Sequence, residues 1–147
     1  MKKFLLLIAV AIAGSFGAQA KDQYVRDVNY LPQTAKTFIG QHFKGSDISV
    51  IKLDKTLGKV TEYEVIMQDG TEISFDRNGN WDNVEMPVKK SVPKAIVPAQ
   101  IASYVAKNYP NQRIVSIDKD RSGYEIELQS GVDLKFNKAG QFKRIDD

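Results

Sequence analysis

Hydrophobic residues recur along this chain first with the spacing of a helix and then with the spacing of a β-strand, and this succession of patterns occurs twice. Each helical stripe follows a proline, Pro32 or Pro98, which suits the first turn of a helix because no backbone N–H is needed there. Gly45 and Pro110 are expected to end the two helices. The stripes consist of Ala35, Phe38, Ile39 and Phe43 in the first half and of Ile101, Tyr104, Val105 and Tyr109 in the second.

After each helix, apolar residues alternate with polar ones, which predicts strands that bury one face. The loops between these strands test the register, because residues paired across a hairpin share a face of the sheet. A two-residue Asp69-Gly70 turn would place Val65 opposite a polar residue, whereas a three-residue loop ending in glycine places it opposite Ile73. Applied to four such loops, the rule pairs Val65 with Ile73, Tyr63 with Phe75, Phe75 with Trp81, Ile126 with Leu134, and Phe136 with Phe142.

These patterns predict an α+β fold of two tandem repeats, each with one helix and a four-stranded antiparallel sheet. The two sheets are expected to join into one longer sheet with both helices on one face. Residues 21–86 form the first predicted repeat, residues 87–96 an extended linker and residues 97–147 the second repeat. The three lysines of the linker are interpreted as solvated residues, and a turn is expected between Asp54 and Val60.

Residues 1–20 have the features of a secretory signal peptide, with two lysines, an apolar stretch and an Ala18-Gln19-Ala20 cleavage pattern. The apolar stretch ends near Phe16, so it is shorter than the roughly 20 residues that cross a bilayer. We therefore expect a periplasmic or secreted protein that starts near Lys21 and is not inserted in a membrane.

The chain carries 21 Lys and Arg residues against 18 Asp and Glu residues, but two of the lysines lie in the predicted signal peptide. The charge of the mature chain is therefore nearly balanced, which argues against a nucleic-acid partner. The sequence contains no cysteine. This excludes disulfides, a thiol nucleophile and cysteine metal sites, so the fold must rest on packing.

The polar side of the predicted sheet carries an excess of acidic residues. Its candidate partner-binding residues are Glu62, Glu64, Ile66, Glu72 and Asp76 in the first half and Glu125, Glu127, Asp133 and Lys135 in the second. Glu127 is expected opposite Asp133 and Glu62 opposite Asp76, and like charges in such positions are mildly destabilising. The strip is either a surface for a cationic partner or metal ion, or a solvated face that keeps the sheet soluble.

Other candidate chemistry has less support in the sequence. Glu64 and Glu72 are close enough for a glycosidase pair, but an open sheet face is expected to keep both solvated, so we predict no enzyme activity and no cofactor. Residues 76–82 space oxygen side chains as a calcium loop does, but the twelfth position is Pro87, and we interpret the segment as a turn. His42 has no partners for a zinc site or a triad.

A signal peptide followed by two copies of a helix and two hairpins resembles the β-lactamase-inhibitor-like, PepSY-like family of exported bacterial proteins. The resemblance is carried by Leu31-Pro32 and Val97-Pro98, by the Tyr-Glu-Val and Tyr-Glu-Ile strands, and by the Asp69-Gly70, Asn78-Gly79 and Ala139-Gly140 turns. That family is similar in shape to a secreted inhibitor that grips its target enzyme with the helix-free face of its sheet. PepSY-type domains are also associated with restraining peptidases.

The resemblance implies an exported, non-enzymatic module that binds a protein or peptide of the cell envelope, with inhibition as one mode of action. An envelope sensor or carrier that binds a metal ion or a small cationic ligand on the acidic face is the alternative. The inhibitor has disulfide-linked repeats, whereas this chain has no cysteine and no segment that matches a target-gripping loop. Inhibition of a β-lactamase is therefore not implied.

Overall fold

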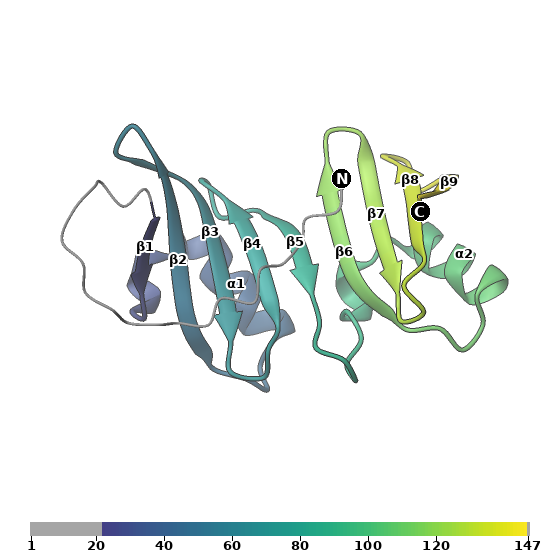
Figure 1. The fold of residues 1–147 in the computed structure, drawn as a ribbon, viewed down its shortest axis with the longest axis horizontal. Helices are drawn as coiled ribbons and strands as arrows, with labels where there is room; N and C mark the ends of the chain where they lie inside the picture. Colours follow the sequence, from purple (N-terminus) through teal and green to yellow (C-terminus); the bar gives the residue numbers. More distant parts are fainter. Residues whose placement is uncertain (1–21, 147) are drawn as a thin grey trace.

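The computed structural model describes residues 22–146 and contains a nine-stranded antiparallel sheet with two α-helices (Figure 1). The strands follow one another across the sheet in chain order. The predicted signal peptide lies outside the described residues. The strands are β1 (Asp22–Val25), β2 (Ile48–Thr56), β3 (Lys59–Met67), β4 (Glu72–Asp76), β5 (Trp81–Glu85), β6 (Ile114–Asp120), β7 (Gly123–Leu128), β8 (Asp133–Asn137) and β9 (Phe142–Asp146). The helices are α1 (Gln33–His42) and α2 (Ala99–Asn108), with short 3-10 helices η1 (Val28–Tyr30) and η2 (Lys94–Ile96).

Both α-helices begin directly after a proline. Pro32 and Pro98 are the N-cap residues, and their carbonyl oxygens accept the first helical hydrogen bonds at 3.1 and 3.0 Å. The helices end at His42 and Asn108, before the glycine and the proline that were expected to end them. The aromatic residue after each helix leaves the helical conformation, with φ of −132° and −131°, which turns the chain toward the next strand.

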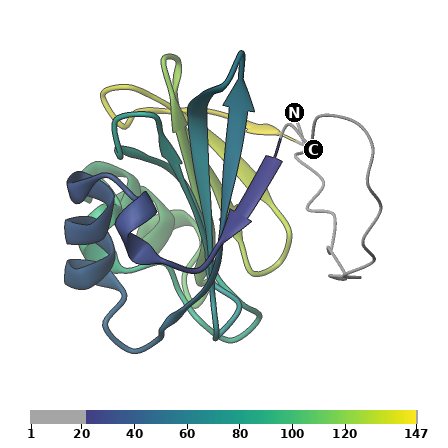
Figure 2. The same ribbon diagram turned by 90° about the vertical axis from the view of Figure 1, so that its left-hand side faces the viewer.

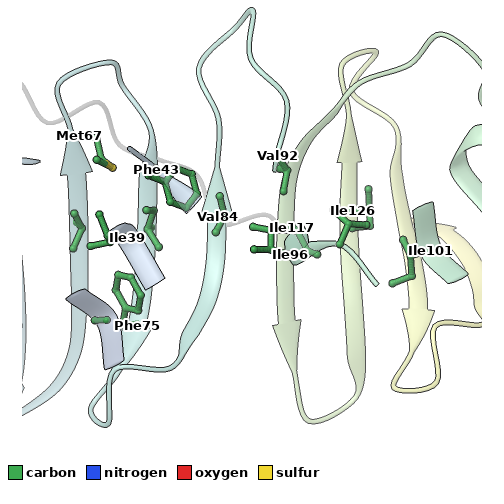
Figure 3. Close-up of a cluster of buried hydrophobic side chains, with 14 of the residues drawn as sticks. Ile39, Phe43, Met67, Phe75, Val84, Val92, Ile96, Ile101, Ile117 and Ile126 are labelled. Carbon is green, nitrogen blue, oxygen red and sulfur yellow. The ribbon is translucent and has the colours of Figure 1, made fainter. Parts of the chain in front are cut away.

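One face of the sheet and one side of each helix contribute to a single hydrophobic cluster (Figure 3). In the side view, α1 and α2 both lie to the left of the strands (Figure 2). The helices contribute Ala35, Ile39, Ile101 and Val105, and the strands contribute Ile51, Leu53, Val65, Met67, Ile73, Phe75, Val84, Ile117, Ile126, Leu128, Leu134 and Phe136. The strand residues alternate with polar ones, so the apolar residues of each strand lie on this buried face and the polar residues lie on the opposite face.

The register predicted from the four glycine loops is confirmed in all four hairpins. Val65 pairs with Ile73 and Ile126 with Leu134, while Phe75 pairs with Trp81 and Phe136 with Phe142. The glycine of each loop has a φ between 81° and 94° and donates its N–H to the carbonyl three residues earlier. This is the geometry of a three-residue hairpin loop, in which glycine accepts the left-handed conformation without strain.

The structure contains more strand than the sequence patterns predicted. β1 pairs with β2 and forms one edge of the sheet, which makes nine strands in place of the predicted eight. The turn expected between Asp54 and Val60 is only Leu57-Gly58, because β2 and β3 continue to either side of it. A bulge after Asp54 interrupts the alternation there, so the strand pattern was hidden in the sequence.

The two halves of the chain meet where β5 pairs with β6 through three residue pairs. The connector, residues 87–96, leads from β5 to α2. Its lysines are exposed, in agreement with the sequence interpretation. However, the connector is not simply extended, because it contains η2 and inserts Val92 and Ile96 into the hydrophobic cluster. Burial of these two residues fixes the connector against the sheet.

Asp69 ties the β3–β4 loop to this connector. Its carboxylate accepts hydrogen bonds from Lys90 Nζ at 2.7 Å and from the Thr71 amide at 2.9 Å. Burial opposes the ionised form, but these hydrogen bonds prevail and lower the pKa of Asp69 to about 2. The loop and the connector are therefore joined by an ion pair that persists to acidic pH.

We expect the Asp69→Asn variant to lose about 1 kcal/mol of unfolding free energy at neutral pH, since the pair with Lys90 is partly exposed. A lowered carboxyl pKa stabilises the folded state above the unfolded pKa, so the difference should vanish as the pH falls from about 4 to about 2. Urea unfolding at several pH values measures both effects. Lys90→Gln should cost a similar amount, and the double variant no more than either; a pH-independent loss would contradict the assignment.

Candidate functional site

The polar face is the face of the sheet opposite the hydrophobic cluster. All nine candidate residues from the sequence lie on it: Glu62, Glu64, Ile66, Glu72, Asp76, Glu125, Glu127, Asp133 and Lys135. The expected pairs of like charge are present, with Glu62 opposite Asp76 and Glu127 opposite Asp133. Because the halves are joined through β5 and β6, the candidates of both halves belong to one continuous surface.

Cross-strand pairing aligns acidic residues of both halves in a row, which we call the acidic row. From β3 to β9 it consists of Ile66, Glu72, Glu85, Ser116, Glu127, Asp133 and Asp146. Five of these seven residues are carboxylates, and none is basic. Like charges in neighbouring ladder positions repel one another, so the adjacent Glu72 and Glu85 cost folding free energy in the isolated chain. At the end of the row, Asp146 is compensated by Lys135 at 3.2 Å and by Arg144 at 3.5 Å.

The neighbouring row carries charges of both signs. It consists of Tyr24, Lys52, Glu64, Ser74, Asn83, Asp118, Glu125, Lys135 and Arg144. Lys52 lies 3.0 Å from Asp54 and 3.8 Å from Glu64, and Lys135 lies 3.6 Å from Glu125. The basic residues of this row lie on β2, β8 and β9. Its residues on β3 to β7 are acidic or neutral, so the middle of the polar face is acidic.

Burial and the crowding of carboxylates raise two pKa values at the centre of the face. Burial, followed by the charges of Glu85 and Glu64, raises the pKa of Glu72 to about 7. Burial and the charges of Glu127 and Glu64 also raise the pKa of Glu85. The expectation that an open sheet face keeps these carboxylates fully solvated is therefore wrong for Glu72, which is half-buried among its neighbours on adjacent strands.

The calcium-like segment, residues 76–82, serves as the β4–β5 turn, as interpreted from the sequence. Asp76 Oδ1 accepts hydrogen bonds from the amides of Asn78 and Asn80 at 2.8 and 3.0 Å. Among residues 22–146, no group of three or more His, Asp or Glu side chains is arranged to hold a metal ion. Within the same residues, no helix is long and apolar enough to cross a membrane.

The surface has two hollows, of which the first includes Asp118, Glu125 and Lys135 of the polar face and the second lies beside α1. One, of about 250 Å³, is lined by residues of β6 to β9 that include Asp120, Tyr124 and Arg144. The other, of about 310 Å³, lies between the end of α1 and the connector and includes His42 and Lys90. The His42 ring contacts Phe38 at 4.8 Å between centroids, which fits the helix-flank position expected for it. Glu72 lines neither hollow, so its raised pKa arises on an open surface.

The sequence patterns missed two acidic residues at the centre of the polar face, Glu85 and Asp118. Glu85 lies beyond a bulge in β5, where the alternation is interrupted at Asp82. Asp118 lies on β6. This strand pairs with β5, but no hairpin loop joins the two strands, so the sequence gives no local signal of the pairing. One signal was available, since Glu85 occupies the position on β5 that Asp146 occupies on β9.

Residues 61–144 match the family described as "Putative beta-lactamase-inhibitor-like, PepSY-like". The chain belongs to this PepSY-like family. The match covers more than half of the chain and includes most of β3, all of β4 to β8 and the first part of β9, so it contains all nine candidate residues. No match was found among curated proteins.

Solved structures from Bacteroides resemble this PepSY-like protein over most of its length. A "putative periplasmic protein of unknown function" from Bacteroides vulgatus is 36% identical, with a TM-score of 0.81 over 86% of this chain and 99% of its own. A "putative calcium-regulated periplasmic protein" from Bacteroides thetaiotaomicron is 36% identical, with a TM-score of 0.79 over 86% and 97% of the two chains. A second Bacteroides vulgatus protein is 35% identical, with a TM-score of 0.79 over 88% and 100%.

All three relatives are described as periplasmic. The location predicted from the sequence, periplasmic or secreted, is thereby confirmed for this PepSY-like protein. The family membership predicted from the repeated helix and hairpin patterns is confirmed as well.

Proposed function

We propose that this PepSY-like protein is an exported, non-enzymatic module that binds a protein or peptide through its polar face. The acidic row carries the proposal, because it brings five carboxylates to one face, and the adjacent Glu72 and Glu85 repel each other in the isolated chain. A cationic partner would relieve that repulsion, so charge complementarity gives both affinity and selectivity. The helices and the hydrophobic cluster lie on the other side, so within residues 22–146 no helix covers this face (Figure 2).

The proposal includes the organisation of the chain as two tandem repeats with both helices on one face. The order of one helix followed by four antiparallel strands occurs twice, and each half supplies carboxylates to the acidic row. Such a duplication widens one binding surface across β3 to β9. If the partner is an enzyme, we propose that this surface covers the active site of the enzyme and thereby inhibits it.

Apolar residues on the polar face define the partner further. Val50 on β2 pairs with Ile66 on β3, and Ile66 stands next to Glu72 in the acidic row. Both apolar side chains are partly accessible. The fitting partner surface therefore presents an aliphatic or aromatic residue close to lysine or arginine side chains. Apolar contact at the edge of a charged surface supplies affinity that salt does not screen.

We expect the Glu127→Lys variant to lose the envelope proteins that the wild type captures, because the change reverses an exposed charge of the acidic row. Asp47→Lys is the matched control, since it makes the same charge change at an exposed loop position outside the strands. Quantitative mass spectrometry of proteins cross-linked in an envelope extract compares the two variants with wild type. Identical partner lists for all three proteins would end the proposal.

A second function is proposed from the same carboxylates: binding of Ca²⁺ or a small cation on the polar face. The raised pKa of Glu72 beside Glu85 and the relative described as "calcium-regulated" favour it. Thermal unfolding with Ca²⁺ and Mg²⁺ up to about 10 mM tests this function, because an ion bound to the native state raises the midpoint, and the rise grows with the logarithm of the ion concentration once this exceeds the Kd. We expect Glu72→Gln to abolish such a shift, and an unchanged midpoint for the wild type excludes the second function.

A further inference from the structure

β5 and β9 occupy corresponding places at the end of the two halves. Each follows a glycine loop, and each skips one residue, Asp82 or Lys143, in its pairing with the preceding strand. Before the skipped residue, an aromatic side chain stands opposite a buried phenylalanine: Trp81 on β5 and Phe142 on β9. The backbone and the side-chain directions of the two strands therefore match position by position.

The far edge of β5 is covered by β6. Val84 pairs with Ile117 and is fully buried, and Lys119 Nζ lies 3.8 Å from the centre of the Trp81 ring. Figure 3 shows Val84 and Ile117 on neighbouring strands, with Ile96 of the connector close to Ile117. β6 thus provides β5 with backbone pairing, an aliphatic neighbour and a cation over an aromatic ring.

The far edge of β9 has no strand beside it within residues 22–146, where it is the last strand of the sheet (Figure 1). Ile145, the counterpart of Val84, is 50% exposed, and Phe142, the counterpart of Trp81, is 36% exposed. An edge strand with accessible apolar side chains pairs readily with another chain. β9 limits such pairing through the charges of Lys143 and Arg144, which admit only a segment with complementary charges.

We propose that the open edge of β9 binds an extended segment of another protein as a tenth, antiparallel strand, and that the segment repeats the chemistry of β6. By the register of β5 and β6, an aliphatic residue stands opposite Ile145 and a small polar residue opposite Asp146. A lysine covers Phe142, as Lys119 covers Trp81. Strand addition of this kind takes its affinity from backbone hydrogen bonds and its selectivity from alternate side chains.

Charge at one further position makes β9 a better match for this pattern than β5 itself. Asp118 of β6 stands opposite the neutral Asn83. The position on β9 that corresponds to Asn83 is occupied by Arg144, so an acidic residue in the bound segment faces a cation. The preferred segment therefore reads small polar, aliphatic, acidic, basic, which is the order of residues 116–119 of this chain.

This site is the backbone edge of β9. It shares Arg144 and Asp146 with the polar face, but it also uses Phe142 and Ile145, and it goes beyond the proposed function because the partner is bound as an added strand. A second copy of this chain is not the proposed occupant, because its β6 is held between β5 and β7. The proposal therefore commits to a different protein with an accessible segment of the stated pattern.

A synthetic peptide of residues 113–121 is the probe, added to the mature full-length protein. We expect amide exchange at Ile145, the counterpart of Val84, to slow by about fivefold or more at saturating peptide, because its N–H points to the open edge. Ile145→Glu should weaken peptide binding by about tenfold, because it removes the aliphatic contact. Val88→Glu is the matched control, since Val88 is 87% exposed on the connector and the variant should bind as wild type does.

A second peptide, in which the residues equivalent to Ile117 and Lys119 are both glutamate, tests the pattern on the unaltered protein. It should bind at least about tenfold more weakly. The proposal is overturned if this peptide binds as well as the first, if exchange slows along β5 rather than β9, or if the protein self-associates through β9 and excludes the peptide. Circular dichroism verifies that Ile145→Glu is folded, and the peptide comparison stands without that variant.

Discussion

Replacing Gly123 with alanine is expected to lower the unfolding free energy by about 3–5 kcal/mol, through backbone strain and steric overlap together. Gly123 is the buried first residue of β7 and has a φ of 140°, a conformation that side chains of L-residues rarely adopt. A Cβ there would overlap the carbonyl oxygen of Phe136 and lie 2.7 Å from the carbonyl carbon of Asn137. The backbones of β7 and β8 can relieve this contact only by separating.

Gly131→Ala is the matched control for this prediction. Gly131 also has a positive φ, of 87°, but a Cβ there meets no atom within 4 Å. The control should therefore lose only about 1 kcal/mol, from backbone conformation alone. Urea unfolding of both variants separates the two contributions, and equal losses would show that close approach at Gly123 is unimportant. A loosened β7–β8 pair also displaces Glu127 and Asp133, so the first variant should weaken partner binding as well.

Loop length and alternation together were sufficient to predict the hairpins. A slip of one residue would have turned Val65 or Ile126 to the polar face, so burial of one face leaves a single acceptable register. Each loop also has glycine where the chain requires a positive φ. Both signals are local in sequence, which explains why these predictions could be made without knowledge of the tertiary structure.

Features that depend on contacts between distant residues could not be predicted in the same way. β1 has only four residues and pairs with a strand that begins 22 residues after it ends, so no hairpin indicates it. The three-pair contact of β5 with β6 likewise joins strands that are separated by the connector and α2. No local pattern in the sequence indicates that Lys119 covers the Trp81 ring. The last two features depend on where the two halves meet, and the first depends on how the start of the described chain packs against β2.

The candidate site, too, could be predicted from local sequence patterns only in part. The sequence placed nine candidates on one face through alternation, and the structure has all nine there. The sequence could not show that Glu85 also lies on this face, because the bulge in β5 interrupts the alternation before Glu85. Without Glu85 the crowding around Glu72 was also hidden, since the pKa shift arises from residues on three different strands. The alternation of apolar and polar residues predicts on which face of the sheet a residue lies. Its neighbours on adjacent strands are known only once the order of the strands is known.

That crowding leads to the second prediction: Glu72→Gln should raise the unfolding free energy by about 1–2 kcal/mol at pH 8, after allowance for partial exposure of the side chain. In the folded protein the pKa of Glu72 is raised to about 7 by burial and by Glu85 and Glu64. The unfolded chain ionises Glu72 near its ordinary pKa of 4.5, so wild-type stability falls as the pH rises from about 4.5 to about 7. Glutamine does not titrate and escapes this loss.

The two proteins should therefore be equally stable at pH 4 and differ increasingly up to about pH 7, after which the difference stays constant. Glu125→Gln on the same face is the control: Glu125 lies 3.6 Å from Lys135 Nζ, so removing its charge should give no gain at pH 8. Urea unfolding across this pH range measures both variants, and a pH-independent gain for Glu72→Gln would contradict repulsion as its cause. If the polar face binds a cationic partner, the stabilised Glu72→Gln protein should bind that partner more weakly, because the charge that destabilises the free chain is the charge that attracts the partner.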